Sequence, residues 1–90
     1  MGKVPYDRYD AAYKIFTQRL RAARIARGLT QAQAAVLVGK AQPWLSRCES
    51  GDRRVDGVEM VLFARAYKLP ENHFIKDVFR SRPRRKRNQG

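Results

Sequence analysis

The stretch from residue 29 to residue 51 constrains the fold of this chain most, because it contains the start and stop signals of two short helices. Thr30 is a good N-cap residue, and Gln33 follows at the spacing of a capping box. Gly39 can adopt the left-handed conformation that ends a helix and turns the chain. We therefore expect two helices joined by a tight turn, over about residues 31–38 and 41–50.

The second of these short helices has distinct inner and outer sides. Leu45 and Cys48 lie three residues apart and share the inner, apolar face. This leaves four side chains on the outer face, where a DNA major groove could receive them: Gln42, Pro43, Ser46 and Arg47. The alternative interpretation of these four is an ordinary solvated helix face.

The net charge favours a polyanionic partner. The 90 residues include 20 Lys and Arg against 8 Asp and Glu, which gives a net charge of +12. The last eleven residues carry six of the basic side chains and no acid, so 14 basic and 8 acidic residues remain in the first 79. Both parts are basic, and an excess of this size in a small domain points to nucleic acid.

The rest of the chain predicts a small all-α domain. Asp10 can cap a first helix over about 11–27, and Gly28 can end it. The apolar residues on the inner face of this helix recur at helical spacing. Asp56 with Glu59 predicts the capping box of a fourth helix, and a short fifth helix is expected over 70–79. The expected organisation is an N-terminal arm over 1–10, a domain over 11–79 and a basic tail over 80–90.

The composition argues against several other classes of protein. One histidine and one cysteine are too few for a zinc finger, and no catalytic constellation is visible, so we expect no metal, no cofactor and no enzyme activity. The N-terminus lacks the apolar core of a signal peptide, and no segment is long enough to span a membrane. The single Cys48 fits a reducing cytoplasm. Nothing indicates a small-molecule ligand.

The tail over 80–90 has no apolar residue except Pro83, so it cannot contribute to a core. We expect it to be disordered without a partner. A solubilising tail and an arm that lies along phosphates are both consistent with such a block of like charge.

Two segments carry a family resemblance: RLRAARIARGLTQAQAA, and then QPWLSRCESGDRRVDGVEMVLFARAYKL. Over roughly residues 17–79 the chain resembles the lambda-repressor/Cro-like helix-turn-helix regulators of the xenobiotic-response-element type. It is most similar to the short stand-alone members from bacteria and their phages or plasmids. The resemblance implies five helices, with the third in the major groove of operator DNA and the second across the backbone.

The chemistry of the four outer residues suggests how bases are read. Gln42 can give a donor and an acceptor to adenine, and Arg47 can fork onto guanine. Ser46 is short and can bond to either base type. Pro43 departs from the polar residues usual at its position, and it offers only an apolar contact, such as with a thymine methyl group.

Six residues are candidates for contacts with the sugar-phosphate backbone: Gln31, Arg24, Lys40, Trp44, Arg53 and Arg54. Gln31 opens the second helix, where backbone N–H groups favour an anion. In the family, a basic residue at the position of Arg24 pairs with the glutamate at the position of Glu49, so Arg24 is expected to be mainly structural. Trp44 either packs partly buried against the second helix or lies on a DNA strand.

The resemblance also implies a homodimer on a palindromic operator. Four apolar residues of the expected last helix exceed the needs of one small core and are candidates for the dimer contact: Phe74, Ile75, Val78 and Phe79. The sequence thus favours a transcriptional regulator, most simply a repressor, with double-stranded DNA as its partner. Two alternatives stay open: an antitoxin that holds a toxin or another regulatory protein, and a general nucleic-acid binder driven by the tail.

Overall fold

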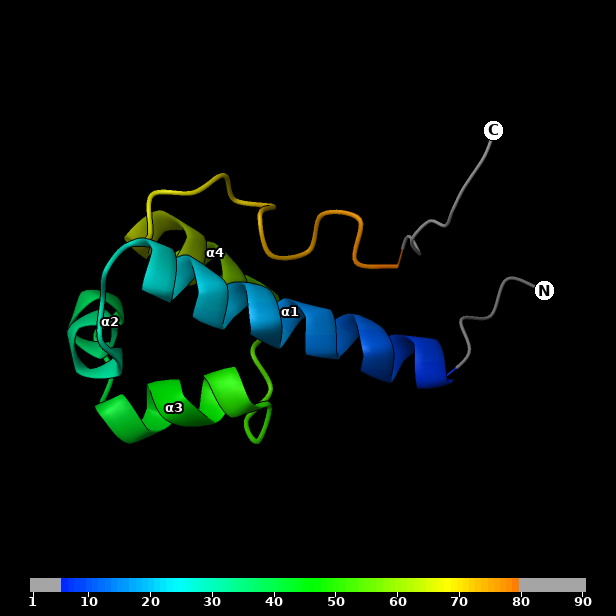
Figure 1. Cartoon of the computed structure of the whole chain (residues 1–90), viewed down its shortest axis with the longest axis horizontal. Coiled ribbons are helices and arrows are strands. Elements are labelled where there is room, and N and C mark those ends of the chain that lie inside the picture. Colours follow the sequence, from blue (N-terminus) through cyan, green and yellow to red (C-terminus); the bar gives the residue numbers. More distant parts are fainter. Residues whose placement is uncertain (1–5, 80–90) are drawn as a thin grey trace.

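Four α-helices make up most of the chain that the computed structural model describes, residues 6–79 (Figure 1). They are α1 (Tyr6–Ala26), α2 (Gln31–Val38), α3 (Gln42–Ser50) and α4 (Gly57–Ala66), and a run of turns follows over residues 71–79. The described residues contain no strand, so the all-α class is confirmed. None of these helices is long and apolar enough to cross a lipid bilayer. Residues 1–5 of the expected arm and the tail over 80–90 lie outside the described residues.

The ends of α2 and α4 follow the predicted capping chemistry. The Thr30 hydroxyl accepts the N–H of Gln33, and the Gln33 side chain accepts the N–H of Thr30. Asp56 and Glu59 form the same reciprocal pair at the start of α4. Gly39 ends α2 with φ of 72°, in the left-handed region where glycine has no side-chain clash.

The start of α1 differs from the prediction. The helix begins at Tyr6, so Asp10 lies inside it and does not cap it. Residues 6–10 contain no proline or glycine that would stop a helix. The ring of Tyr9 also stacks on that of Tyr13 one turn later, with centroids 6.4 Å apart, which supports the additional turn.

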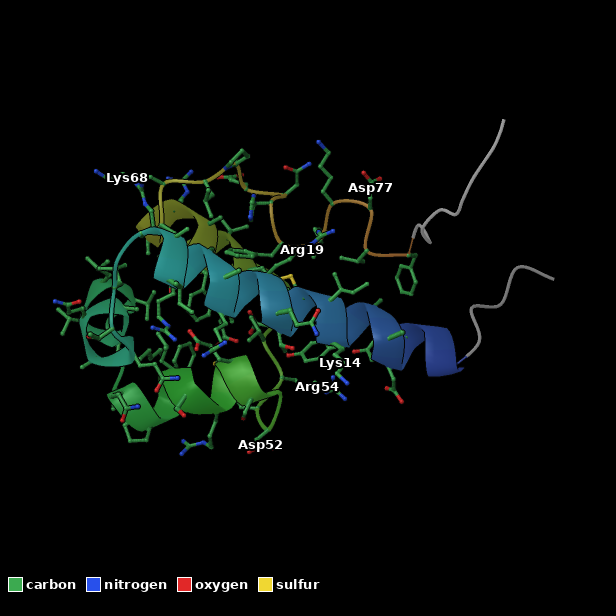
Figure 2. The ribbon with its side chains drawn as sticks, viewed as in Figure 1. Lys14, Arg19, Asp52, Arg54, Lys68 and Asp77 are labelled. Carbon is green, nitrogen blue, oxygen red and sulfur yellow. The ribbon has the colours of Figure 1, made fainter. Side chains whose placement is uncertain are left out.

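The fifth helix expected over 70–79 does not form; the segment makes successive turns. Its backbone N–H groups bond irregularly to carbonyls three or four residues back, and Asp77 has a positive φ of 58°, which interrupts a helix. Arg19 of α1 donates through Nη1 to carbonyl oxygens of this segment, of which that of Lys76 is nearest at 2.7 Å. Figure 2 shows Arg19 and Asp77 on this side of the molecule. A cation from α1 thus holds carbonyls that a regular helix would have used internally.

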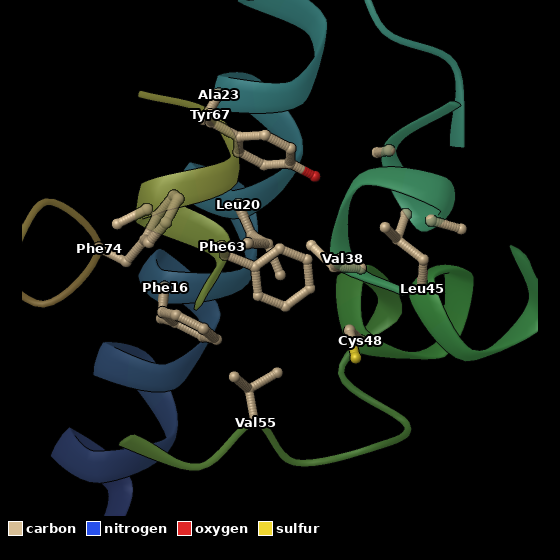
Figure 3. Close-up of a cluster of buried hydrophobic side chains, with 13 residues drawn as sticks. Phe16, Leu20, Ala23, Val38, Leu45, Cys48, Val55, Phe63, Tyr67 and Phe74 are labelled. Carbon is tan, nitrogen blue, oxygen red and sulfur yellow. The ribbon is translucent and has the colours of Figure 1, made fainter. Parts of the chain in front are cut away.

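One hydrophobic core joins all four helices and the turn segment (Figure 3). Phe63 of α4 and Leu20 of α1 are fully buried there. Cys48 is also fully buried, as its spacing from Leu45 predicts, and burial raises the pKa of its thiol. The Tyr67 hydroxyl is buried with no hydrogen-bond partner among the described residues, and burial raises the pKa of Tyr67 as well. Both groups therefore stay neutral near pH 7.

Candidate nucleic-acid interface

The turn between α2 and α3 brings two helices together and leaves one face of α3 open. Small buried side chains of α2, Ala34 and Ala35, allow the two helices to approach closely, and Leu45 packs from α3. The outer face of α3 carries the four predicted base-reading residues: Gln42, Pro43 and Arg47 are exposed and Ser46 is half-buried. Pro43 occupies the first turn of α3, where its missing N–H costs no hydrogen bond.

A chain of side-chain hydrogen bonds connects this outer face to the protein interior. Nε2 of Gln42 donates to Oε1 of Gln31 at 2.7 Å, and Nε2 of Gln31 donates to Oε1 of Glu49 at 3.2 Å. The Glu49 carboxylate only accepts, so it fixes which end of the Gln31 amide faces Gln42. Gln42 then keeps its oxygen and one N–H for a partner outside the protein. Sequence reasoning selected Gln31 and Gln42 separately and missed this connection.

The inner end of the chain is the ion pair between Arg24 and Glu49. Nε of Arg24 lies 2.6 Å from Oε2 of Glu49, and Nη2 lies 3.1 Å from Oε1. Nη1 donates to the backbone oxygen of Leu29 at 2.8 Å. The two side chains are only 10% and 4% exposed, and the hydrogen bonds to Glu49 raise the pKa of Arg24. Arg24 therefore ties α1 to α3, and little of it is accessible to a phosphate.

Trp44 lies on the opposite flank of α3 from Gln42. It is half-buried against the core cluster, to which α2 contributes Ala34, Ala35 and Val38, and its ring stacks on Phe63 of α4 with centroids 5.8 Å apart. Two cations lie over the Trp44 ring: Nζ of Lys40 at 5.2 Å and the guanidinium of Arg53 at 4.9 Å from its centroid. The ring thus gathers positive charge beside α3.

The two arginines after α3 have different partners. Arg53 donates to both carboxylate oxygens of Glu59, at 2.9 and 3.0 Å, and also to the backbone oxygen of Arg54. The Arg54 guanidinium lies over the ring of Tyr13, 4.1 Å from its centroid. Of these two predicted phosphate contacts, Arg53 is therefore the one whose charge a carboxylate partly neutralises.

The residues proposed for a dimer contact divide into two groups. Phe74 is 1% exposed and packs edge-on against Phe16 and Tyr67, so it belongs to the core and is not available to a second chain. Ile75 and Phe79 are exposed, and Val78 is half-buried. These three border an apolar groove of about 180 Å³ whose other walls are Tyr9, Ala12, Tyr13, Phe16, Val55 and Met60.

Acidification is expected to weaken the fold through Glu59. The hydrogen bonds from Arg53, and then that from the Asp56 N–H, lower the pKa of the Glu59 carboxyl below its ordinary 4.5. The stability it contributes is complete above that ordinary value and is lost as the pH falls through the lower, folded-state pKa. Glu59→Gln should therefore flatten the decline of melting temperature below about pH 5. If the melting temperature of the variant falls with pH as steeply as that of the wild type, other carboxyl groups cause the acid destabilisation.

Comparison with known proteins gives one family. The model of a family described as a helix-turn-helix domain matches residues 15–74, which include α2, α3, α4 and every candidate base-reading residue. Among curated proteins, none matches the chain significantly.

Proposed function

The chain belongs to the helix-turn-helix domain family, and from that premise we propose that it is a sequence-specific regulator of transcription. The proposal places it with the lambda-repressor/Cro-like regulators and gives it the role of a repressor at a palindromic operator. α3 enters the major groove and reads base edges, while α2 lies across the sugar-phosphate backbone.

The observation that carries this proposal is the ordered polar chain behind Gln42. A base-reading amide discriminates best when its donor and acceptor are already oriented, because reorientation on binding costs entropy. Glu49 holds Gln31, and Gln31 accepts one N–H of the Gln42 amide, which leaves the Gln42 oxygen and the other N–H for DNA. This is the pair of groups that adenine N6 and N7 require. Arg47, exposed one turn later, supplies the fork that suits guanine.

Contacts with the backbone surround this reading face. The first N–H groups of α2 favour an anion, because no carbonyl within the helix accepts them. Lys40 and Arg53 lie beside α3 over Trp44, and Arg54 follows in the next loop. In the proposal these groups position the protein on the duplex without selecting a sequence.

The proposed homodimer uses the apolar edge formed by Ile75, Val78 and Phe79. Two exposed apolar side chains, Ile75 and Phe79, next to a groove that Val78 also borders favour contact with a second, identical surface. Sedimentation of the purified protein, alone and on operator DNA, tests this contact. A monomer at micromolar concentration that also binds DNA only as a monomer would refute it.

The proposed function is tested by competition between DNA from the protein's own upstream region and scrambled DNA of equal length. Physiological salt is needed, because phosphate attraction alone hides specificity at low salt. We expect a preference of about 10³ or more for one duplex sequence. If the upstream region shows none, selection from randomised duplexes extends the test to distant operators, and failure there would favour a general nucleic-acid binder.

Deleting residues 80–90 separates positioning from reading. The deletion removes six positive charges, so it should weaken binding to all DNA sequences similarly and reduce the dependence of affinity on salt. The ratio of affinities for the preferred and scrambled duplexes should stay the same. A changed sequence preference would show that the tail takes part in reading.

A further inference from the structure

The loop after α3 holds one arginine in a way that preserves its charge. Arg53 is bonded through two nitrogens to the Glu59 carboxylate, whereas Arg54 forms no ion pair with any carboxylate of residues 9–79, the part of the chain whose side chains are described. Instead, the Arg54 guanidinium lies 4.1 Å from the ring centroid of Tyr13 and 5.7 Å from that of Tyr9. A carboxylate neutralises a guanidinium and occupies its N–H groups. An aromatic face orients the planar group and leaves its charge and its N–H edge available.

Tyr13 is itself fixed from two directions. Its ring packs against the buried Phe16, with centroids 5.3 Å apart, and its hydroxyl accepts the N–H of Val55 at 2.9 Å. Val55 directly follows Arg54, so Tyr13 contacts both the backbone and the side chain of this loop. Tyr9 stacks beside it, with the two rings within 14° of parallel. Both tyrosines precede residue 15, where the match to the family begins.

The position of Arg54 continues the proposed DNA-binding side of the molecule. Figure 2 shows Arg54 and Lys14 on the side of α1 that faces α3, beyond the carboxyl end of α3, with Asp52 nearby. Asp52 is exposed in the same loop and repels a phosphate. Arg54 therefore contributes a net attraction here if its charge is held closer to the phosphate than the Asp52 carboxylate is.

We propose that the ring of Tyr13, with Tyr9 beside it, positions Arg54 to bind a backbone phosphate next to the DNA segment that α3 reads. The inference rests on the proposed function and extends the DNA interface to the N-terminal half of α1. The physical gain is preorganisation, because a long, flexible side chain loses less conformational entropy on binding when it is already oriented.

A double-mutant cycle tests this coupling. The DNA is the duplex that the wild-type full-length chain prefers, and its affinity is measured for Tyr13→Leu, Arg54→Gln and the double variant. In the chain that keeps Arg54, Tyr13→Leu should weaken DNA binding about threefold. In the Arg54→Gln background, the same substitution should leave the affinity unchanged. Tyr13→Phe keeps the ring and should keep most of the affinity, even if loss of the Val55 hydrogen bond lowers the melting temperature. An equal loss with and without Arg54, or a Phe variant as weak as the Leu variant, would overturn the proposal.

Two further variants keep the test decisive. If Tyr13→Leu does not fold, Tyr9→Leu replaces it, because Tyr9 is 43% exposed and its loss should weaken binding less but with the same dependence on Arg54. Arg21→Gln, an exposed arginine elsewhere on α1, controls for the loss of one charge. A wild-type chain that prefers no duplex would refute the proposed function, whereas specific binding without coupling would refute only the role of the tyrosines.

Discussion

Glu49→Gln is expected to lower the free energy of unfolding by about 3 kcal/mol, because it leaves the buried Arg24 guanidinium without a counter-charge. The pair is bidentate and almost fully buried, so water cannot replace the lost carboxylate. A folded domain is stable by only about 5–15 kcal/mol, which makes this loss large. DNA affinity should fall as well, since Glu49 also orients Gln31 and through it Gln42. Denaturant unfolding and titration with operator DNA measure the two effects.

The exposed pair of Arg65 and Glu71 provides the matched control. It has a similar N–O distance of 2.8 Å, but its side chains are 74% and 57% exposed. Glu71→Gln should therefore change stability by less than about 1 kcal/mol. If Glu49→Gln left both the melting temperature and the DNA affinity unchanged, the pair would not lock α3 to α1.

Arg47→Ala is expected to weaken the operator complex by about 1–3 kcal/mol and to relax the preference at one base pair. Its side chain is exposed on the outer face of α3, and the core does not depend on it. The melting temperature should therefore stay near that of the wild type. Affinities for a set of operators, each substituted at one base pair, measure the change in preference.

The pattern of loss across those operators identifies the role of Arg47. A base-reading arginine gives a loss that depends on the base at one position. A uniform loss on every sequence, together with a smaller salt dependence, would instead make Arg47 a phosphate contact. Arg21→Ala controls for removing an exposed arginine, because Arg21 lies on α1 outside the proposed interface.

Local chemistry made much of the fold predictable. Capping depends on side chains three residues apart, so Thr30 with Gln33 and Asp56 with Glu59 marked the starts of α2 and α4 correctly. The left-handed turn at Gly39 favours glycine, which adopts a positive φ without strain, and this preference is also local. The outer face of α3 followed from the helical period and from the apolar pair Leu45 and Cys48.

Predictions failed where a distant residue decides the outcome. The apolar spacing of residues 70–79 suggested a helix, but Arg19 binds carbonyls of that segment and Phe74 turns into the core. The stacking of Trp44 on Phe63 of α4 was not anticipated either. Neither contact leaves a signal in the nearby sequence, because Lys76 lies 57 positions from Arg19 and Phe63 lies 19 positions from Trp44.

The sequence by itself determined the starts of α2 and α4, the turn at Gly39, the inner and outer faces of α3 and the excess of positive charge. These properties depend on residues within about one or two helical turns of each other, or on composition alone. The tertiary structure decided how the charged and polar groups are used. It joined Gln42 to Glu49 through Gln31, paired Arg53 with Glu59 and placed Arg54 on Tyr13. Such partners are selected by distance and burial in the folded chain, since electrostatic and hydrogen-bond energies depend on geometry that spacing in the sequence does not specify.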